Sequence, residues 1–288
     1  MRRIELPYAK SLANRVMLLR ALRGESLPLA DSLWNDDMHA MLRVLKAPVG
    51  PDGVRRADAG PAGTAYRFGM AYWAAQPGAE VVLCGDARMR ERPITPLVEA
   101  LRRLGASFDA VPEGWRIQGV QWPLGEVEVD ARESSQFASA LVLVASVAAP
   151  NLNVVTSLGV SSPPYLAMSY QLAARAELGW PPERDWSAAF VFCAAVGLSR
   201  RSVLLSGLTL ESVQGDVVCG QWGAELGFAL SSTPEGIVAE PAVPLDGTWT
   251  VDFGAQPDLA MPAIIAAALL GRDGTASGLH TLNAKESP

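Results

Sequence analysis

The stretch LVEALRRLGASFDAVPEGWRIQG, residues 97–119, recurs in outline as VVCGQWGAELGFALSSTPEGIVAE at residues 217–240. Each stretch has the pattern of a helix, a Gly-Ala pair, a strand, a Pro-Glu-Gly turn and a second strand. The recurrence predicts that the chain repeats an α-β-β unit. Between the two copies lies the Pro-rich stretch LGWPPERD, residues 178–185, which is typical of a crossing between domains. We therefore expect a boundary near Pro182 that divides the chain into residues 1–182 and 183–288.

Outside the two copies, the hydrophobic periodicity alternates between helix and strand. Helical spacing of apolar residues occurs at residues 12–22, 36–45, 64–75, 95–104, 134–148, 164–176, 186–196 and 259–270. Strand-like runs occur at residues 80–83, 126–129, 152–156, 202–205 and 249–253. The alternation predicts a mixed α/β (α+β) fold.

Composition excludes several classes of protein. The chain has 288 residues, of which 49% are apolar and 19% charged, and its net charge of −6 argues against a nucleic-acid surface. Its longest apolar stretches, at residues 141–149 and 263–270, are too short to span a membrane, and the N-terminus has no apolar signal segment. Three cysteines without a CxxC pair and two histidines predict no metal site. We expect a soluble cytoplasmic protein without nucleic-acid or membrane partners.

Three polar stretches each precede a helical run. LPYAKSLANR, residues 6–15, places Lys10, Ser11 and Arg15 at a helix start, where unpaired N–H groups and the helix dipole favour an anion. Similar starts are DAGPAGTAYR, residues 58–67, where Gly63 precedes Thr64 and Arg67, and RESSQF, which carries Ser134, Ser135 and Gln136. Each alone is also compatible with an ordinary helix cap and solvated charges. Together they favour a site for more than one anion.

Two further stretches carry charged residues suited to anion binding and proton transfer. If GDARMRERPI, residues 85–94, is extended, Arg88, Arg90 and Arg92 project to one side and suit a carboxylate or phosphate. Pro93 favours an extended Arg92, although a solvated loop with Glu91 paired to an arginine is the alternative. Asp258 precedes an apolar helix, and Glu286 follows Lys285 near the end of the chain. The alternative for Asp258 is an ordinary helix cap, and the alternative for Lys285 and Glu286 is a frayed, charged chain end.

The order of these motifs resembles that of the 3-phosphoshikimate 1-carboxyvinyltransferase family, the 5-enolpyruvylshikimate-3-phosphate (EPSP) synthases. The matching pieces, in family order, are LPYAKSLANR, LWNDDMHAML, GPAGTAYRF, GDARMRERPITPLVEALRRLGA, ESSQFASALVL, SSPPYLAMS, DWSAAF, PDLAMPAIIAAAL and NAKES. The resemblance implies a two-lobed enolpyruvyl transferase fold in which each lobe is built from repeated βαβαββ units.

The resemblance also implies an activity in the shikimate pathway, which leads to chorismate and the aromatic amino acids. The enolpyruvyl group of phosphoenolpyruvate would pass to the 5-hydroxyl of shikimate 3-phosphate, without a metal or an organic cofactor. By analogy, phosphoenolpyruvate would contact Gly63 and Arg88, and Lys10 would touch both substrates. Asp258 would be the base and Glu286 the acid, with Lys285 nearby. The residues expected to bind phosphorylated shikimate are Ser11, Arg15, Ser134, Ser135, Gln136, Ser162 and Tyr165.

The chain departs from the family pattern at several positions. Pro61, Pro163 and Thr281 stand where the family commonly has asparagine, lysine and asparagine, and the stretches 46–57 and 176–184 are short. The family also continues beyond the Lys-Glu pair, so we expect an incomplete second lobe with impaired turnover. Apolar faces of the helices at 186–196 and 259–270 would then be exposed, which favours self-association.

Three functional hypotheses remain open from the sequence. The first is the shikimate-pathway transferase, and the second is the sister UDP-N-acetylglucosamine enolpyruvyl transferase. The sister family carries a reactive cysteine in its mobile loop, whereas residues 85–93 contain none and Cys84 lies in the preceding strand. The third is a non-catalytic fragment that only binds shikimate 3-phosphate.

Overall fold

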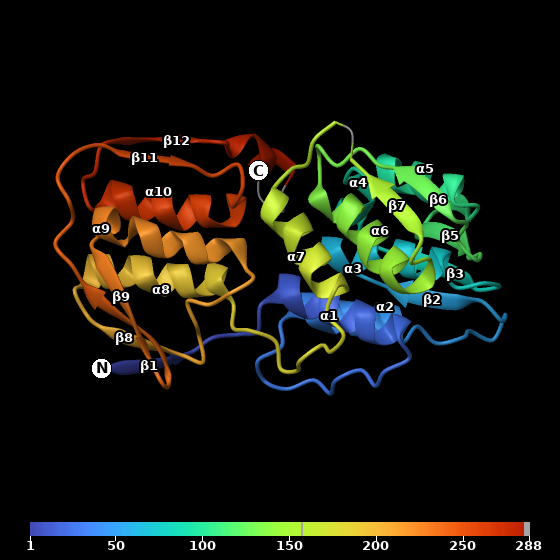
Figure 1. Ribbon diagram of the computed structural model, residues 1–288, viewed down its shortest axis with the longest axis horizontal. Helices are drawn as coiled ribbons and strands as arrows, with labels where there is room; N and C mark the ends of the chain where they lie inside the picture. Colours follow the sequence, from blue (N-terminus) through green and yellow to red (C-terminus); the bar gives the residue numbers. More distant parts are fainter. Residues whose placement is uncertain (157, 285–288) are drawn as a thin grey trace. The chain divides into compact units, whose positions relative to one another are not determined.

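The computed structural model describes residues 1–156 and 158–284, and the chain divides into two compact units (Figure 1). The inserted unit comprises Lys10–Trp180. The terminal unit comprises Met1–Ala9 together with the chain from Pro181 onward. The polypeptide therefore leaves the terminal unit near its N-terminus and returns to it within the Pro-rich stretch.

The first nine residues depart from the predicted division, which placed residues 1–182 together. Strand β1 (Arg2–Glu5) pairs in parallel with β8 (Val203–Ser206), with Ile4 opposite Leu205. Because strand backbone groups need hydrogen-bonding partners, this pairing places the N-terminus in the terminal unit. No local signal in the sequence identifies a partner strand so far along the chain.

The inserted unit alternates helices and strands. Its elements are α1 (Lys10–Leu22), α2 (Asp36–Leu45), β2 (Arg55–Asp58), α3 (Gly63–Ala74), β3 (Glu80–Cys84), α4 (Ala87–Glu91), α5 (Thr95–Arg103), β4 (Ser107–Val111), β5 (Gly114–Gln118), β6 (Gly125–Glu128), α6 (Ser135–Ala148), β7 (Leu152–Val155) and α7 (Pro163–Ala173). The strands form a four-stranded sheet in the order β2-β3-β5-β4 and a parallel pair, β6-β7.

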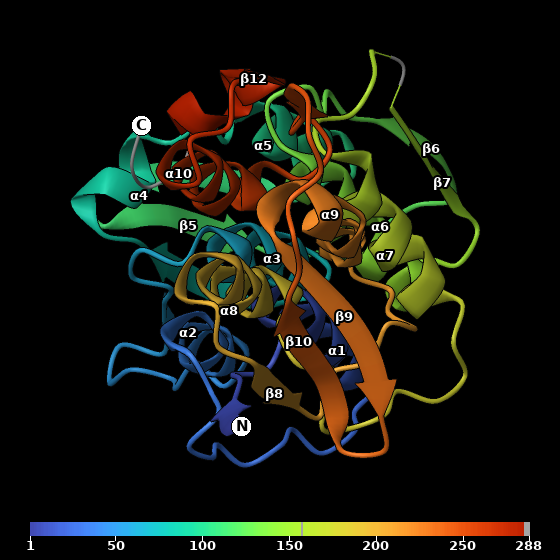
Figure 2. The same cartoon turned by 90° about the vertical axis from the view of Figure 1, so that its left-hand side faces the viewer.

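The terminal unit contains the remaining elements. They are β1, α8 (Trp186–Ser199), β8, the 3-10 helix η1 (Gly215–Trp222), α9 (Gly223–Leu226), β9 (Phe228–Thr233), β10 (Gly236–Pro241), β11 (Trp249–Asp252), the 3-10 helix η2 (Pro257–Leu259), α10 (Ala260–Leu269), β12 (Gly274–Ser277) and the 3-10 helix η3 (Leu279–Ala284). Helices α8, α9 and α10 run side by side and are seen nearly end-on in Figure 2. Their core includes Trp186 and Phe190 from α8 and Phe228 from β9.

Every helical run and strand predicted from periodicity is present, with ends that differ by at most three residues. The mixed α/β class and the repeat are confirmed. The two four-stranded sheets have the same topology. Each joins a parallel pair of strands to an antiparallel hairpin, in the orders β2-β3-β5-β4 and β1-β8-β10-β9. Each unit therefore contains one βαβαββ segment, and in the terminal unit the inserted unit interrupts it after β1.

The helix of the second copy differs from the prediction. Residues 215–222 form the 3-10 helix η1, and only the four residues of α9 are α-helical. Gly215, Gly220 and Gly223 lie in this segment, and glycine is unfavourable in an α-helix by about 1 kcal/mol relative to alanine. The glycine content therefore explains the weaker helix.

The third residue of each Pro-Glu-Gly turn lies too close to a neighbouring strand to carry a side chain. A Cβ on Gly114 would lie 2.1 Å from the carbonyl oxygen of Leu83, and a Cβ on Gly236 would lie 2.1 Å from that of Leu205. Both glycines also have positive φ, at +154° and +146°. Each hairpin thus packs its turn against the neighbouring strand at a separation that only glycine allows.

Large apolar side chains are exposed on two helices of the terminal unit, as expected from the sequence. Val191 on α8 is 52% exposed, and Met261, Ile265 and Leu269 on α10 are 58%, 50% and 68% exposed. Self-association through these faces stays a prediction. Across the described residues, no helix combines the length and apolar character needed to cross a membrane.

Replacing Gly114 by alanine is predicted to lower the free energy of unfolding by about 2 kcal/mol or more, because the added methyl collides with a strand carbonyl. Urea unfolding monitored by circular dichroism measures the change. The control is Gly179→Ala in the same unit, where a Cβ would meet nothing within 4 Å. Equal stability of the two variants would contradict the close-packing account.

Candidate anion-binding site

The first turn of α1 presents Lys10 and Ser11. The Lys10 side chain is 50% exposed, and its Nζ lies 3.3 Å from Oδ2 of Asp37 in the first turn of α2. Ser11 is partly buried, and its carbonyl oxygen accepts a hydrogen bond of 2.6 Å from Nη1 of Arg15. The lysine is therefore the accessible cation of this helix start, whereas the arginine turns inward.

Arg15 is buried, with only 1% of its surface exposed. Its Nε donates to Oγ of Ser169 at 2.8 Å, and its Nη2 donates to the carbonyl oxygen of Tyr165 at 2.9 Å and to Oγ of Ser139 at 3.4 Å. The guanidinium also lies 5.4 Å from the ring centroid of Phe68. Burial lowers the pKa of Arg15 to about 10, so the group is still charged at neutral pH.

These contacts of Arg15 bring three helix starts together. Its own helix is α1, Ser139 lies in the second turn of α6, and Tyr165 lies in the first turn of α7. One of the five guanidinium N–H groups stays outside these bonds. In this structure Arg15 chiefly holds the frame of the site, and it has little surface to offer a ligand.

A second buried arginine joins α3 to α6. Nη1 of Arg67, which is 3% exposed, donates to Oε1 of Gln136 at 2.7 Å. Nε2 of Gln136 in turn donates to Oγ1 of Thr64 at 3.1 Å. Thr64 and Arg67 are three residues apart and therefore share one helix face. The first turns of α1, α3, α6 and α7 thus converge within the inserted unit.

Gly63 begins α3 beside two guanidinium groups. A Cβ at this position would lie 2.8 Å from Nη1 of Arg92 and 2.9 Å from Nη1 of Arg67. The missing side chain allows both cations to approach the helix start. Burial, followed by the positive charge of Arg92, lowers the pKa of Arg67 to about 9. The adjacent cations make this part of the inserted unit strongly positive within an acidic protein.

The starts of α6 and α7 supply the remaining predicted hydroxyls. Ser134 is the N-cap of α6, and its Oγ accepts from the backbone N–H of Gln136 at 3.3 Å, while Ser135 is 5% exposed. Ser162 is the N-cap of α7 and has a left-handed backbone, with φ 49° and ψ 66°. Such strain in a residue other than glycine is commonly found at functional sites. Tyr165 is partly buried one turn into α7.

The arginine loop is not extended as predicted. Residues 87–91 form the short helix α4, for which Asp86 is the N-cap, accepting from the backbone N–H of Met89 at 2.7 Å. Arg88 and Arg90 therefore belong to this short helix, and Arg92 is the residue that follows its end. Arg92 itself is extended, with φ −72° and ψ 147°, as its position before Pro93 predicts. The Asp86 cap favours a helical turn over the extended segment considered in the sequence analysis.

The predicted proton-transfer residues lie outside this cluster of the inserted unit. Asp258 belongs to the terminal unit, where it is exposed in η2. Lys285 and Glu286 lie outside the described residues. Arg67 and Arg92, by contrast, belong to stretches that the sequence predicts to suit anions, but neither was assigned to a substrate. The spacing of Thr64 and Arg67 on one helix face was the available signal for Arg67.

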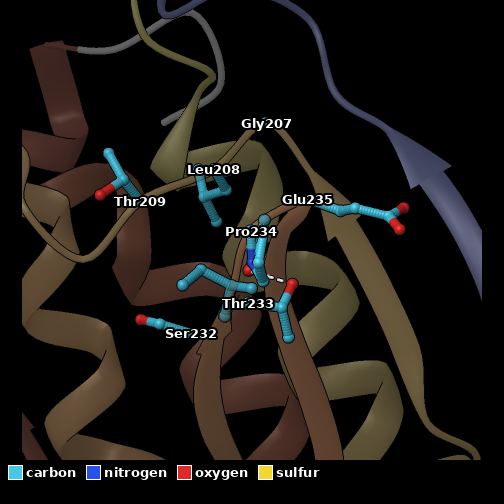
Figure 3. Close-up of a pocket in the computed structure, with 9 residues that line it drawn as sticks. Gly207, Leu208, Thr209, Ser232, Thr233, Pro234 and Glu235 are labelled. Carbon is cyan, nitrogen blue, oxygen red and sulfur yellow. Dashed lines mark hydrogen bonds between the residues drawn. The ribbon is translucent and has the colours of Figure 1, made fainter.

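A pocket in the terminal unit is lined by none of the predicted site residues that the structure describes (Figure 3). It lies at the turn between β9 and β10, where Oγ1 of Thr233 donates to the carbonyl oxygen of Gly236 at 2.9 Å. The lining residues are Gly207, Leu208, Thr209, Ser232, Thr233, Pro234, Glu235, Gly236 and Ile237. None of these lining residues is a cation, and Glu235 is an anion.

Comparison with known proteins identifies the family. The sequence profile of EPSP synthase (3-phosphoshikimate 1-carboxyvinyltransferase) matches residues 51–177 and 174–288. The chain belongs to this family. It is 32% identical to 3-phosphoshikimate 1-carboxyvinyltransferase from Bacteroides fragilis, over 99% of this chain and 74% of that protein. The enzyme of the same name from Bordetella petrii is also 32% identical, over 94% of this chain and 72% of that protein.

Solved structures of the family agree with the fold. Two structures of EPSP synthase from Acinetobacter baumannii give TM-scores of 0.52 and 0.53 at 15% sequence identity. Each comparison covers 98% of this chain and 92% of the solved chain. The resemblance inferred from the motifs is thus confirmed for both family and fold.

Replacing Arg15 by lysine is predicted to lower the free energy of unfolding by about 3 kcal/mol. Lysine cannot reproduce the planar set of bonds to three helices and leaves their acceptors unpaired in the interior. Chemical denaturation measures the loss. Arg20→Lys on the same helix is the control, because the side chain of Arg20 bonds the nearby Ser26 and Glu25 and no other described residue. This substitution should change stability by less than about 0.5 kcal/mol. Equal effects would show that Arg15 does not tie the helices together.

Proposed function

We propose that the chain transfers the enolpyruvyl group of phosphoenolpyruvate to the 5-hydroxyl of shikimate 3-phosphate and releases phosphate. The observation that carries the proposal is the convergence of the first turns of α1, α3, α6 and α7 around basic side chains. Helix N-termini offer N–H groups and a positive dipole end to an anion. Both substrates are anionic, and the chain belongs to the family that bears the name of this reaction.

Each substrate has a distinct set of proposed contacts. Lys10, which is accessible, would contact both substrates, while Gly63 and Arg88 would lie on the phosphoenolpyruvate side. Arg15 would act on shikimate 3-phosphate mainly by fixing the positions of Ser11 and Tyr165, to which it is hydrogen-bonded through their carbonyl oxygens. The other proposed contacts of shikimate 3-phosphate are Ser134, Ser135, Gln136 and Ser162.

The reaction requires two opposed proton transfers. The attacking hydroxyl loses a proton, while the methylene carbon of phosphoenolpyruvate gains one, so one base and one acid are needed. Asp258 is the proposed base and Glu286 the proposed acid, with Lys285 beside it, and Asp258 and Lys285 are also proposed to contact substrate. The protein would carry this out without a metal or an organic cofactor. We propose that the reaction takes place in the cytoplasm.

Isothermal titration calorimetry with shikimate 3-phosphate tests the binding half of the proposal. The unmodified chain should bind, and Lys10→Met should weaken binding at least about tenfold by removing one charge-assisted contact. The control is Lys46→Met, since Lys46 is an exposed lysine at the end of α2 and should not affect binding. A folded sample that gives no heat with millimolar shikimate 3-phosphate would overturn the proposed site.

Phosphate release tests the chemical step. Phosphate should form from phosphoenolpyruvate only when shikimate 3-phosphate is present, and Asp258→Asn should reduce the rate about a hundredfold or more, the usual contribution of a general base. Asp246→Asn, at an exposed loop position, should leave the rate unchanged. Turnover with UDP-N-acetylglucosamine instead would favour the sister transferase. Binding without any phosphate release would favour the non-catalytic alternative.

A further inference from the structure

The amide of Gln136 is held at both ends by side chains from one face of α3. Its Oε1 accepts from Nη1 of Arg67 at 2.7 Å, and its Nε2 donates to Oγ1 of Thr64 at 3.1 Å. Gln136 is itself partly exposed at the start of α6, whereas Arg67 is only 3% exposed. A ligand at this helix start can therefore reach Gln136 far more easily than Arg67.

The chemistry of arginine fixes which way the amide points. A guanidinium group has donors only, so the oxygen of the Gln136 amide must face Arg67. The NH2 end must then face the opposite way, where one of its two N–H groups is bonded to Thr64. The second N–H group remains for a ligand. The pair thus makes Gln136 a hydrogen-bond donor at the site, which suits an anion.

Arg67 is itself held rigidly enough to impose this orientation. Its Nη2 donates to the carbonyl oxygen of Pro93 at 3.1 Å, and its guanidinium lies 5.3 Å from the ring centroid of Phe137. Phe137 follows Gln136 directly in α6, so Arg67 contacts two consecutive residues of that helix. These contacts leave the guanidinium little freedom to follow a rotating amide.

We propose that Arg67 is a positioning residue that directs an amide N–H group of Gln136 toward the anionic substrate. This inference rests on the proposed function, because shikimate 3-phosphate is the anion concerned. Without Arg67, the amide can rotate by half a turn and present its oxygen, an acceptor that repels an anion. Arg67 therefore acts through Gln136 and does not touch the substrate.

The first test compares binding of shikimate 3-phosphate to Arg67 variants by calorimetry. Arg67→Met should weaken binding at least about tenfold, and Arg67→Lys, which keeps a donor for the amide oxygen, should recover part of the loss. Arg55→Met is the matched control, because Arg55 likewise bonds a backbone carbonyl, that of Ala47, and lies over an aromatic ring, that of Trp73. Loss of binding in the control as well would indicate a general structural effect and overturn the inference.

The second test separates positioning from structure. In a Gln136→Leu background, Arg67→Met should cause no further loss of binding, because Arg67 acts only through the amide. Gln136→Glu should keep the thermal stability, since a carboxylate still accepts from Arg67, but should lose binding because no N–H donor remains. Additive losses in the double variant, or normal binding by a folded Gln136→Glu variant, would overturn the inference. Failure of the unmodified chain to bind would instead overturn the proposed function.

Discussion

The arrangement of the candidate site depends on one buried guanidinium group, that of Arg15. It bonds backbone or hydroxyl oxygens on its own helix α1, on α6 and on α7. A buried charge without such partners would cost several kcal/mol, so the three helices must stay in contact with it. Ser11 and Tyr165 occupy their places because this charge requires their carbonyl oxygens, and the convergence of helix starts follows from it.

The same logic applies on a smaller scale around α3. Arg67 is buried beside Arg92, and Gly63 provides the space that both need. Two neighbouring arginines raise the positive potential at this helix start, although the chain as a whole has a net negative charge. The sheets serve a different purpose, since their repeated hairpins, each closed by a glycine against a strand carbonyl, provide the rigid support on which the helices pack.

Local patterns in the sequence were sufficient to predict most helices and strands and the α-β-β repeat, because hydrophobic periodicity and turn residues act over short distances. The partner of β1 could not be predicted, since Arg2–Glu5 and Val203–Ser206 meet only in the folded chain. In the arginine loop, Pro93 correctly predicts the extended Arg92, whereas the helical turn at residues 87–91 depends on the cap at Asp86. The inward role of Arg15 was also beyond local patterns, because Ser139, Tyr165 and Ser169 are distant in sequence.

The most direct test of the central claim is hydrogen–deuterium exchange measured by mass spectrometry with and without saturating shikimate 3-phosphate. The account predicts slower exchange in peptides that cover the first turns of α1, α6 and α7, where Ser11, Gln136 and Tyr165 lie. Peptides that cover the hairpin of β9 and β10 should exchange at an unchanged rate. Protection confined to that hairpin and its pocket, on a sample that binds the ligand, would contradict the claim that the converging helix starts form the site.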